Sequence, residues 1–184
     1  MTAELFLIAP PGPLPEPILA AIRDVAARTE VAALLLPRRD LAENTYKTLV
    51  KAVVPAAQAS GIAVLIEGEP GLVRMLGADG LHVSGSLAAV REAVSALKPD
   101  RIVGAAALGT RDDAMLKGEA GVDYILFGPL FGAIDPAQRE MGRWWAQTME
   151  IPSVLSDPGA DLERYDAAGC EFIGLPLPVS GEQP

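Results

Sequence analysis

Eight short apolar segments follow one another along the 184 residues of this chain, and they constrain its fold more than any other feature. Each is four to six residues long, rich in branched aliphatic residues and without strict alternation, which is typical of strands buried on both faces. Helical patterns lie between them, so the sequence predicts parallel strands joined by right-handed crossovers. The segments are Glu4–Ala9, Val31–Leu36, Ile62–Ile66, Gly80–Val83, Arg101–Ala106, Tyr124–Gly128, Pro152–Leu155 and Phe172–Leu175.

Eight such units predict a compact (β/α)8 barrel formed by a single domain spanning residues 1–184. Because only residues 176–184 follow the last segment, the final helix is expected to be missing or vestigial. We expect a homodimer partner or a terminal segment to cover the wall that this leaves open. A doubly wound open sheet is the alternative, but no G-x-G-x-x-G motif follows the first segment.

An internal repeat supports regular strand–helix alternation. Gly77-Ala78-Asp79, Gly121-Val122-Asp123 and Gly169-Cys170-Glu171 each place a glycine, one small or apolar residue and an acid directly before a predicted strand. A glycine in the left-handed region ends a helix and turns the chain toward the sheet. We expect each copy to form such a turn, and we expect Cys170 to be structural.

Local signals fix several helix ends. Ser86 and Thr110 are expected to cap the N-termini of two helices, and Pro70 suits the first turn of a short helix that ends near Leu76. The segment 41–60 also has a helical pattern, but Pro55 lies within it and predicts a kink or an early end.

The composition excludes several classes of function. The chain has 15 Lys and Arg against 24 Asp and Glu, a net charge of −9, which argues against binding nucleic acid or an anionic membrane surface. One cysteine and one histidine exclude a disulfide framework, a cysteine-cluster metal site and a two-histidine zinc site. No apolar run approaches the ~20 residues that cross a bilayer, and residues 1–10 lack the features of a signal peptide. We expect a cytoplasmic protein.

Candidate chemistry is expected where the strands end, because parallel barrels hold their sites there. His82 is a candidate catalytic residue for proton transfer, and the alternative is a hydrogen-bonded structural histidine. Arg38 and Arg39 are candidates for binding a phosphate or carboxylate, and the alternative is a surface salt bridge. Gly128 and Pro129 are candidates for substrate binding; the glycine either admits a ligand close to the backbone or only makes the turn.

Four further side chains have both a functional and a structural explanation. Glu67 and Glu69 follow the third segment and form either a displaced metal site or a solvated rim. Trp144 and Trp145 are adjacent, so one is expected in the core and the other is a candidate interface residue.

Several segments resemble the thiamine phosphate synthase/TenI family, in the family's order. They are Val31–Asp40, Gly77–Val83, Gly104–Ala114, Gly121–Phe131 (GVDYILFGPLF), and Arg143–Trp145 followed by Glu150–Pro152. The resemblance implies a (β/α)8 barrel that acts on a small phosphorylated heterocycle in thiamine metabolism. The family's synthases join a pyrimidine pyrophosphate to a thiazole phosphate with Mg²⁺ and release pyrophosphate, whereas its TenI-type members aromatise the thiazole phosphate.

The resemblance also implies that most Mg-pyrophosphate ligands are replaced here. Only Arg39 keeps a cationic role in the second strand, and Glu67-Gly68 stands where Asn-Asp is expected. The family's other phosphate and metal ligands, and the TenI-type histidine, are replaced at Leu35, Pro37, Ser84–Leu87, Ala106, Leu108, Ala133–Pro136, Asp157-Pro158 and Leu175-Pro176.

Three functions stay open on these grounds. The chain is a family enzyme acting on a phosphorylated heterocycle, a divergent enzyme that uses His82 and Arg39, or a non-catalytic paralogue that binds a metabolite or a partner. Apart from the displaced site considered at Glu67 and Glu69, we assign no metal-binding residues, and no cofactor is evident beyond the Mg²⁺ that the family uses.

Overall fold

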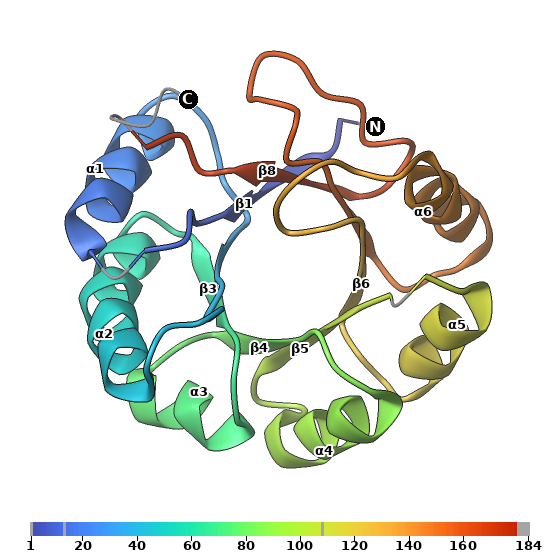
Figure 1. Ribbon diagram of the computed structural model, residues 1–184, viewed down its shortest axis with the longest axis horizontal. Helices are drawn as coiled ribbons and strands as arrows, with labels where there is room; N and C mark the ends of the chain where they lie inside the picture. The colour runs from blue at the N-terminus through green and yellow to red at the C-terminus, as the bar shows by residue number, and fades with distance from the viewer. Residues whose placement is uncertain (1, 13, 108, 180–184) are drawn as a thin grey trace.

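The protein is seen here as a computed structural model that describes residues 2–12, 14–107 and 109–179. Eight parallel strands run in chain order, and the sheet closes because β8 pairs with β1 (Figure 1). The predicted (β/α)8-type barrel is therefore confirmed, and the open sheet is excluded. The strands are β1 (Glu4–Ile8), β2 (Ala33–Leu36), β3 (Ala63–Ile66), β4 (Gly80–Val83), β5 (Ile102–Ala106), β6 (Tyr124–Phe127), β7 (Ser153–Ser156) and β8 (Phe172–Pro176).

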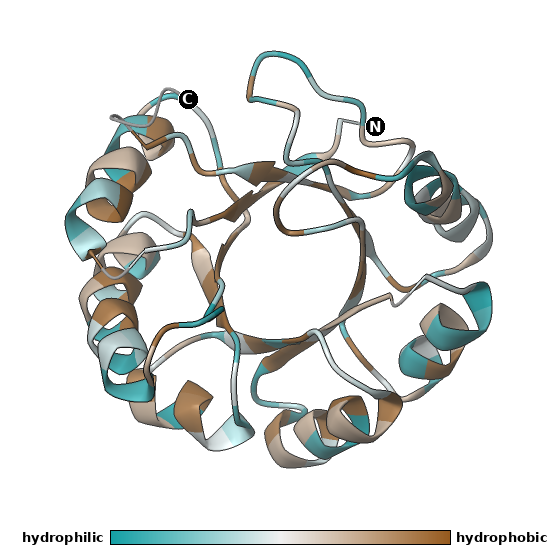
Figure 2. Ribbon diagram, in the orientation of Figure 1, coloured by the Kyte–Doolittle hydropathy of each residue, from teal (hydrophilic) through white to brown (hydrophobic). Residues whose placement is uncertain are grey.

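Six helices surround the barrel in the described part of the chain. They are α1 (Pro15–Ala26), α2 (Glu43–Ala59), α3 (Pro70–Leu76), α4 (Leu87–Leu97), α5 (Arg111–Glu119) and α6 (Pro136–Thr148). Two predicted caps are confirmed: Ser86 accepts a hydrogen bond from the Ala89 N–H, and Thr110 accepts one from the Asp113 N–H. In Figure 2 the strands are mostly brown and the outer sides of α5 and α6 mostly teal, so the apolar residues gather at the sheet.

Helix α2 does not end early at Pro55, which is exposed and lies inside the helix. Proline removes one N–H, but its position on the solvent side lets water satisfy the carbonyl left without a donor. Val53, Val54 and Ala57 are buried against the core on either side of it. Their burial keeps the helix going to Ala59, so the expected early end is wrong, and the alternative of a kink at Pro55 stays a prediction.

The three repeated acids anchor neighbouring strands. Asp79 accepts a hydrogen bond from the Val64 N–H at 2.7 Å, and Asp123 accepts one from the Val103 N–H at 2.8 Å. Glu171 accepts bonds from both the N–H and the hydroxyl of Ser153. Each acid precedes an even-numbered strand and binds the strand before it, after a glycine with positive φ.

Strand–helix alternation fails between β7 and β8, because residues 157–171 form no helix. Three aspartates in this segment accept hydrogen bonds from backbone N–H groups two or three residues further on: Asp157 from Gly159, Asp161 from Glu163 and Arg164, and Asp166 from Ala168. Such local bonds favour successive turns over a helix. The expectation of a helix in every unit is wrong here for that reason.

The segment 157–171 nevertheless covers the wall beside β8. Leu162 and Tyr165 pack against the outer core, and the outward-facing Leu7, Ile173 and Leu175 are buried within the single chain. No helix follows β8 in residues 177–179, and the remainder of the tail lies outside the described residues. The cover thus comes from an internal segment rather than a terminal one, and the homodimer stays a prediction.

Candidate functional site

The mouth of the barrel, at the C-terminal ends of the strands, is covered in part by an apolar plug made of Leu130 and Phe131. Leu130 and Phe131 lie in the loop 128–135 between β6 and α6 and pack against the cluster that fills the barrel, which includes Ile8, Leu35 and Leu126. Figure 1 shows this loop curling inward over the opening before it reaches α6. Leu130 and Phe131 therefore cover apolar side chains of the interior at this end of the barrel.

The predicted site residues Gly128 and Pro129 begin this loop and make it close onto β7. A Cβ atom at Gly128 would lie 2.3 Å from the Ser156 carbonyl oxygen, and its φ is +94°. The Pro129 carbonyl accepts a hydrogen bond from the Ser156 hydroxyl at 2.6 Å. Packing of the loop alone explains the glycine at this position, and a role in substrate binding stays a prediction.

The two predicted arginines separate at the rim of the mouth. Arg39 is exposed, has a positive φ of 46°, and places its guanidinium carbon 4.5 Å from the centroid of the Phe131 ring. Arg38 is half-buried, and its Nε donates to the Leu41 carbonyl. Neither arginine forms an ion pair with a described carboxylate, so the predicted alternative of a salt bridge is not what holds them.

Both arginines line a small pocket beside the plug. Its volume is about 270 Å³, and its walls are the β1–α1 loop and the β2–α2 loop. The lining residues are Pro11, Gly12, Pro37, Arg38, Arg39, Asp40 and Leu41. Two guanidinium groups beside a cavity of this size suit a small anion.

Glu67 holds three loops of the rim together. One carboxylate oxygen accepts the Arg38 N–H at 2.9 Å, and the other accepts the Ser84 hydroxyl at 2.8 Å. The Glu67 N–H donates to the Tyr46 hydroxyl, which in turn donates to the Leu36 carbonyl. These bonds make Glu67 a structural group within the rim, whereas Glu69 is exposed.

His82 points into the barrel, as predicted, and is 1% exposed. Its Nδ1 lies 2.9 Å from the hydroxyl of Tyr124, and the two rings are stacked with centroids 5.8 Å apart. The Nε2 atom has no hydrogen-bond partner among the described residues. Burial, and then the positive charge of Lys117, lower the pKa of His82 to about 4, so the imidazole is neutral at pH 7.

Tyr124 fits only because its neighbour on β5 has no side chain. Gly104 pairs with Tyr124 in register, and a Cβ atom there would lie 1.9 Å from the tyrosine ring. Burial raises the pKa of Tyr124 above its ordinary range, so its hydroxyl keeps its proton and bonds to His82. His82 and Tyr124 thus form a hydrogen-bonded polar pair among the apolar side chains that fill the barrel.

Asp157 takes the place at the end of β7 where the family resemblance puts a phosphate cradle. It is 9% exposed, one oxygen pairs with Arg139, and the other accepts the Gly159 N–H. Pro158 and Pro176 supply no N–H donors nearby. Asp157 and Arg139 thus bond to each other, and neither proline offers an N–H to a phosphate at these positions.

The described residues do not fit the Mg²⁺ that the family uses. Mg²⁺ is bound through carboxylates and demands near-octahedral geometry. The oxygens of Glu67 and Asp157 are already bonded to protein groups, and the described chain has no group of three or more His, Cys, Asp or Glu side chains that could hold a metal ion.

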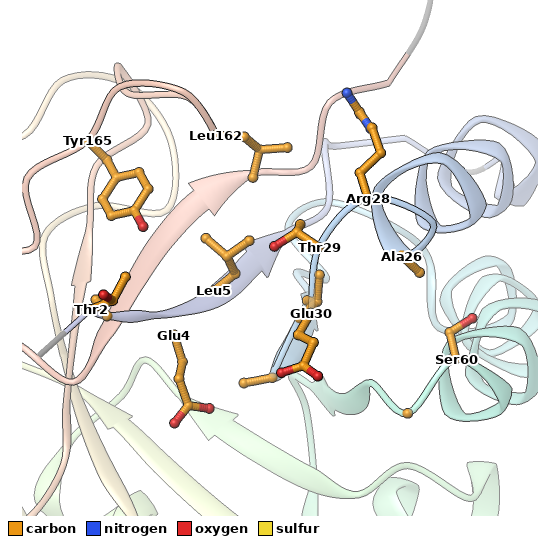
Figure 3. Close-up of a pocket in the computed structure, with 14 residues that line it drawn as sticks. Thr2, Glu4, Leu5, Ala26, Arg28, Thr29, Glu30, Ser60, Leu162 and Tyr165 are labelled. Carbon is orange, nitrogen blue, oxygen red and sulfur yellow. The ribbon is translucent and has the colours of Figure 1, made fainter.

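A larger cavity lies at the opposite end of the barrel. Its volume is about 1110 Å³, and it is lined by the start of β1, the α1–β2 and α2–β3 connections, and the segment 157–171. Figure 3 shows Leu162 and Tyr165 beside Leu5 of β1. This is the N-terminal end, which in barrels of this kind serves stability rather than chemistry. His82 and Arg39 do not line it.

The remaining predicted residues have structural surroundings. Trp145 is 1% exposed and donates to the Ile151 carbonyl, which confirms one tryptophan in the core. Trp144 is half-buried beneath the guanidinium of Arg111, and its role as an interface residue stays a prediction. Cys170 is buried, and burial raises the pKa of its thiol. Leu108 lies outside the described residues.

Sequence reasoning did not assign roles to Tyr124 and Phe131. Gly104 was a signal for the first, because a glycine inside a closed barrel leaves space that a large side chain on a neighbouring strand must fill. No sequence signal indicates that Phe131 turns inward, since this depends on the path of a loop.

Among the helices of the described residues, none combines the length and the hydrophobicity that a membrane span requires.

Comparisons with known proteins agree with this architecture. A family model described as thiamine monophosphate synthase matches residues 5–156. Thiamine-phosphate synthase of Rhodospirillum centenum is 35% identical over 94% of this chain and 86% of its own length. The enzyme of the same name from Hyphomonas neptunium is 40% identical over 67% of this chain and 59% of its own length. Thiamine phosphate pyrophosphorylase from Pyrococcus furiosus, 17% identical, shares the fold with a TM-score of 0.72 over 94% of this chain and 85% of its own. The chain belongs to the thiamine monophosphate synthase family.

Proposed function

We propose that this protein binds a small phosphorylated or carboxylated heterocycle of thiamine metabolism at Arg38 and Arg39, and does not catalyse the Mg-dependent displacement of pyrophosphate. The proposal rests on which charged side chains of the rim are bonded to other protein groups and which are not. Two guanidinium groups that form no ion pair with a described carboxylate border a pocket of about 270 Å³, while the carboxylates of Glu67 and Asp157 are bonded to protein groups.

The arginines favour an anionic ligand. A planar guanidinium offers a fork of donors that matches phosphate and carboxylate oxygens. Arg39 is exposed beside the pocket, and its contact with the Phe131 ring leaves the edge of the guanidinium available for such bonds. The pocket volume is below the range of roughly 300–1,000 Å³ typical of drug-sized ligands, so it suits a small one.

The rest of the mouth opposes a diphosphate with its metal. A leaving pyrophosphate needs several cations and N–H donors placed where its charge develops. Here the plug of Leu130 and Phe131 is apolar, and Asp157 places a carboxylate at the end of β7. Asp157 pairs with Arg139 and accepts the Gly159 N–H, so a cation and an N–H donor at this end of β7 are already bonded to the protein instead of to a phosphate.

A second candidate is an enzyme of altered chemistry that uses His82. It is favoured by the Nε2 atom, which is buried and has no hydrogen-bond partner among the described residues. The neutral imidazole is available to exchange a proton with a bound ligand, and Tyr124 fixes its orientation. A binding protein and such an enzyme differ in one respect: only the enzyme converts the ligand and depends on His82 for that conversion.

Calorimetric titration with thiazole phosphate, thiamine phosphate and inorganic phosphate tests the proposal. We expect saturable binding of at least one phosphorylated heterocycle, at least about tenfold weaker in Arg39→Gln because a charged pair is lost. Arg111→Gln is the matched control, since Arg111 also stacks on an aromatic ring but lies on the outside of the barrel. Absence of binding, or equal binding by the two variants, would overturn the assignment.

Product analysis of the same mixtures separates the two candidates. The binding function predicts that the ligand is recovered unchanged after long incubation. Conversion of the ligand by the wild type, lost in His82→Gln, would favour the enzyme instead.

A further inference from the structure

The imidazole of His82 is incompletely bonded in the closed barrel. The side chain is 1% exposed and bonds to Tyr124 through Nδ1, but its Nε2 has no partner among the described residues. Buried polar atoms nearly always find a partner, so one left alone calls for a specific explanation. One explanation is a second state of the mouth, in which a water molecule or a ligand reaches this atom.

The plug over the interior is bracketed by two glycines in the left-handed region. Gly128 has φ +94° and Gly132 has φ +88°, and between them lie Pro129, Leu130 and Phe131. A Cβ at Gly132 would meet no atom within 4 Å, so its space is open on the outer side of the loop. Hinges are a few loop positions that absorb backbone rotation, and these two positions flank the residues that pack inward.

One exposed side chain holds the plug from outside. Arg39 lies over the Phe131 ring with its guanidinium carbon 4.5 Å from the centroid, and its φ of 46° is uncommon for a residue with a side chain. Backbone conformations of this kind persist where the surroundings enforce them and gather at ligand clamps and switch regions. The contact links the β2–α2 loop, which lines the small pocket, to the loop that closes the barrel.

We propose that the 128–135 loop is a gate over His82, that Phe131 is its closing residue, and that Arg39 is the latch. Release of the ring from Arg39 lets the loop turn about Gly128 and Gly132 and opens a path to the His82–Tyr124 pair. An anion that engages Arg39 would draw the guanidinium from the ring, so occupancy of the rim pocket would favour the open gate. The gate itself does not depend on the identity of that anion.

The sole histidine gives a direct test by chemical modification. Diethyl pyrocarbonate carbethoxylates neutral imidazole, and the absorbance change at about 240 nm reports His82 alone because the chain contains one histidine. The rate is measured on the whole protein at pH 7.5 without ligand, against N-acetylhistidine as the unprotected reference, and hydroxylamine reversal identifies the adduct. We expect His82 of the wild type to react at least about a hundredfold more slowly than the reference, as its burial requires.

Two variants open the gate to different extents. Phe131→Ala removes the closing ring, and we expect modification at least about tenfold faster than in the wild type. Arg39→Gln removes only the latch, and we expect an increase of about two- to fivefold, the change in opening equilibrium that an exposed cation–π contact supplies. Because Arg39 is exposed, this second variant tests the proposal even if Phe131→Ala does not fold.

Matched controls separate a gate from general loosening. Phe172→Ala truncates an aromatic side chain that packs against the same interior cluster from the opposite end of the barrel, and Arg111→Gln removes the cation–π contact on Trp144. Both controls are expected to react like the wild type. The proposal is overturned if Phe172→Ala is modified as fast as Phe131→Ala, if Arg39→Gln equals Arg111→Gln, or if the wild type reacts at the rate of N-acetylhistidine.

Discussion

At both ends of the barrel, carboxylate side chains accept hydrogen bonds from backbone N–H groups, but the pattern of these bonds differs between the two ends. At the N-terminal end, Asp79, Asp123 and Glu171 repeat one arrangement, in which an acid before an even-numbered strand accepts an N–H of the strand before it. At the mouth, Glu67 and Asp157 have unrelated partners in loops. The N-terminal end is thus repeated framework, whereas the mouth is assembled residue by residue.

This contrast indicates that residues at the mouth can change more easily than residues at the N-terminal end of the barrel. The repeated acids hold the strands in register, and they keep the barrel whatever the loops at the other end carry. We infer that side chains at the mouth can change without loss of the barrel, because these three bonds do not involve the mouth. The present mouth combines a partly buried apolar plug with two arginines at the rim, and our proposal is that this combination replaces the family's metal and phosphate ligands.

The largest expected effect concerns the interior that the mouth closes off. The folded-state pKa of His82 is about 4, below the ordinary value of 6.5, so folding opposes protonation of the imidazole. Its contribution to stability is present above pH 6.5 and is lost as the pH falls toward 4. A shift of this size corresponds to about 3 kcal/mol of unfolding free energy. Urea unfolding between pH 4.5 and 7.5 measures this contribution as the difference in unfolding free energy between the wild type and His82→Gln.

We expect that difference to change by most of this amount across the range, because the variant carries no imidazole. A difference that is independent of pH would show that His82 is already solvated in the native state. The mouth would then be open, and the contrast between a closed interior and an adaptable rim would fail.

A smaller effect is expected from the framework at the N-terminal end. Glu171→Ala removes the acceptor for two donors of the fully buried Ser153, and leaving them without a partner costs about 2 kcal/mol after relaxation. Glu171→Gln retains an acceptor oxygen and should lose less than half as much. Unfolding free energies at pH 7 measure both, and equal losses would mean that the hydrogen bonds are not the cause.

The smallest effect is expected at the rim. Glu67→Gln keeps one acceptor for the Arg38 N–H or the Ser84 hydroxyl, and the groups released lie near solvent. We expect a loss of about 1 kcal/mol in unfolding free energy. If this variant is destabilised as much as Glu171→Ala, the rim is framework too, and the distinction drawn between the ends of the barrel is wrong.

The sequence predicted the features that depend on local chemistry. Strand positions, the caps at Ser86 and Thr110, and the glycine turn at Gly77 follow from burial patterns and from bonds within a few residues. The absence of a helix before β8 was not predicted. A helix was expected there only because the other units have one, and the turns formed by three aspartates in 157–171 prevent it.

The mouth was less predictable because its contacts join residues far apart in the chain. Arg39 meets Phe131, and Glu67 meets both Arg38 and Ser84, through the meeting of separate loops. The sequence placed His82 inside the barrel, but the bond to Tyr124 required the register of β5 and β6 around Gly104. Residue types indicated what chemistry was available, and only the closed barrel brought these residues together.

We propose that this protein keeps the family barrel without the family's pyrophosphate chemistry. The most direct measurement is an incubation of the purified protein with pyrimidine pyrophosphate, thiazole phosphate and Mg²⁺, followed by chromatographic detection of thiamine phosphate. The account predicts no product above the level of a protein-free control, at any Mg²⁺ concentration. Formation of thiamine phosphate in proportion to the protein, and dependent on Mg²⁺, would contradict it.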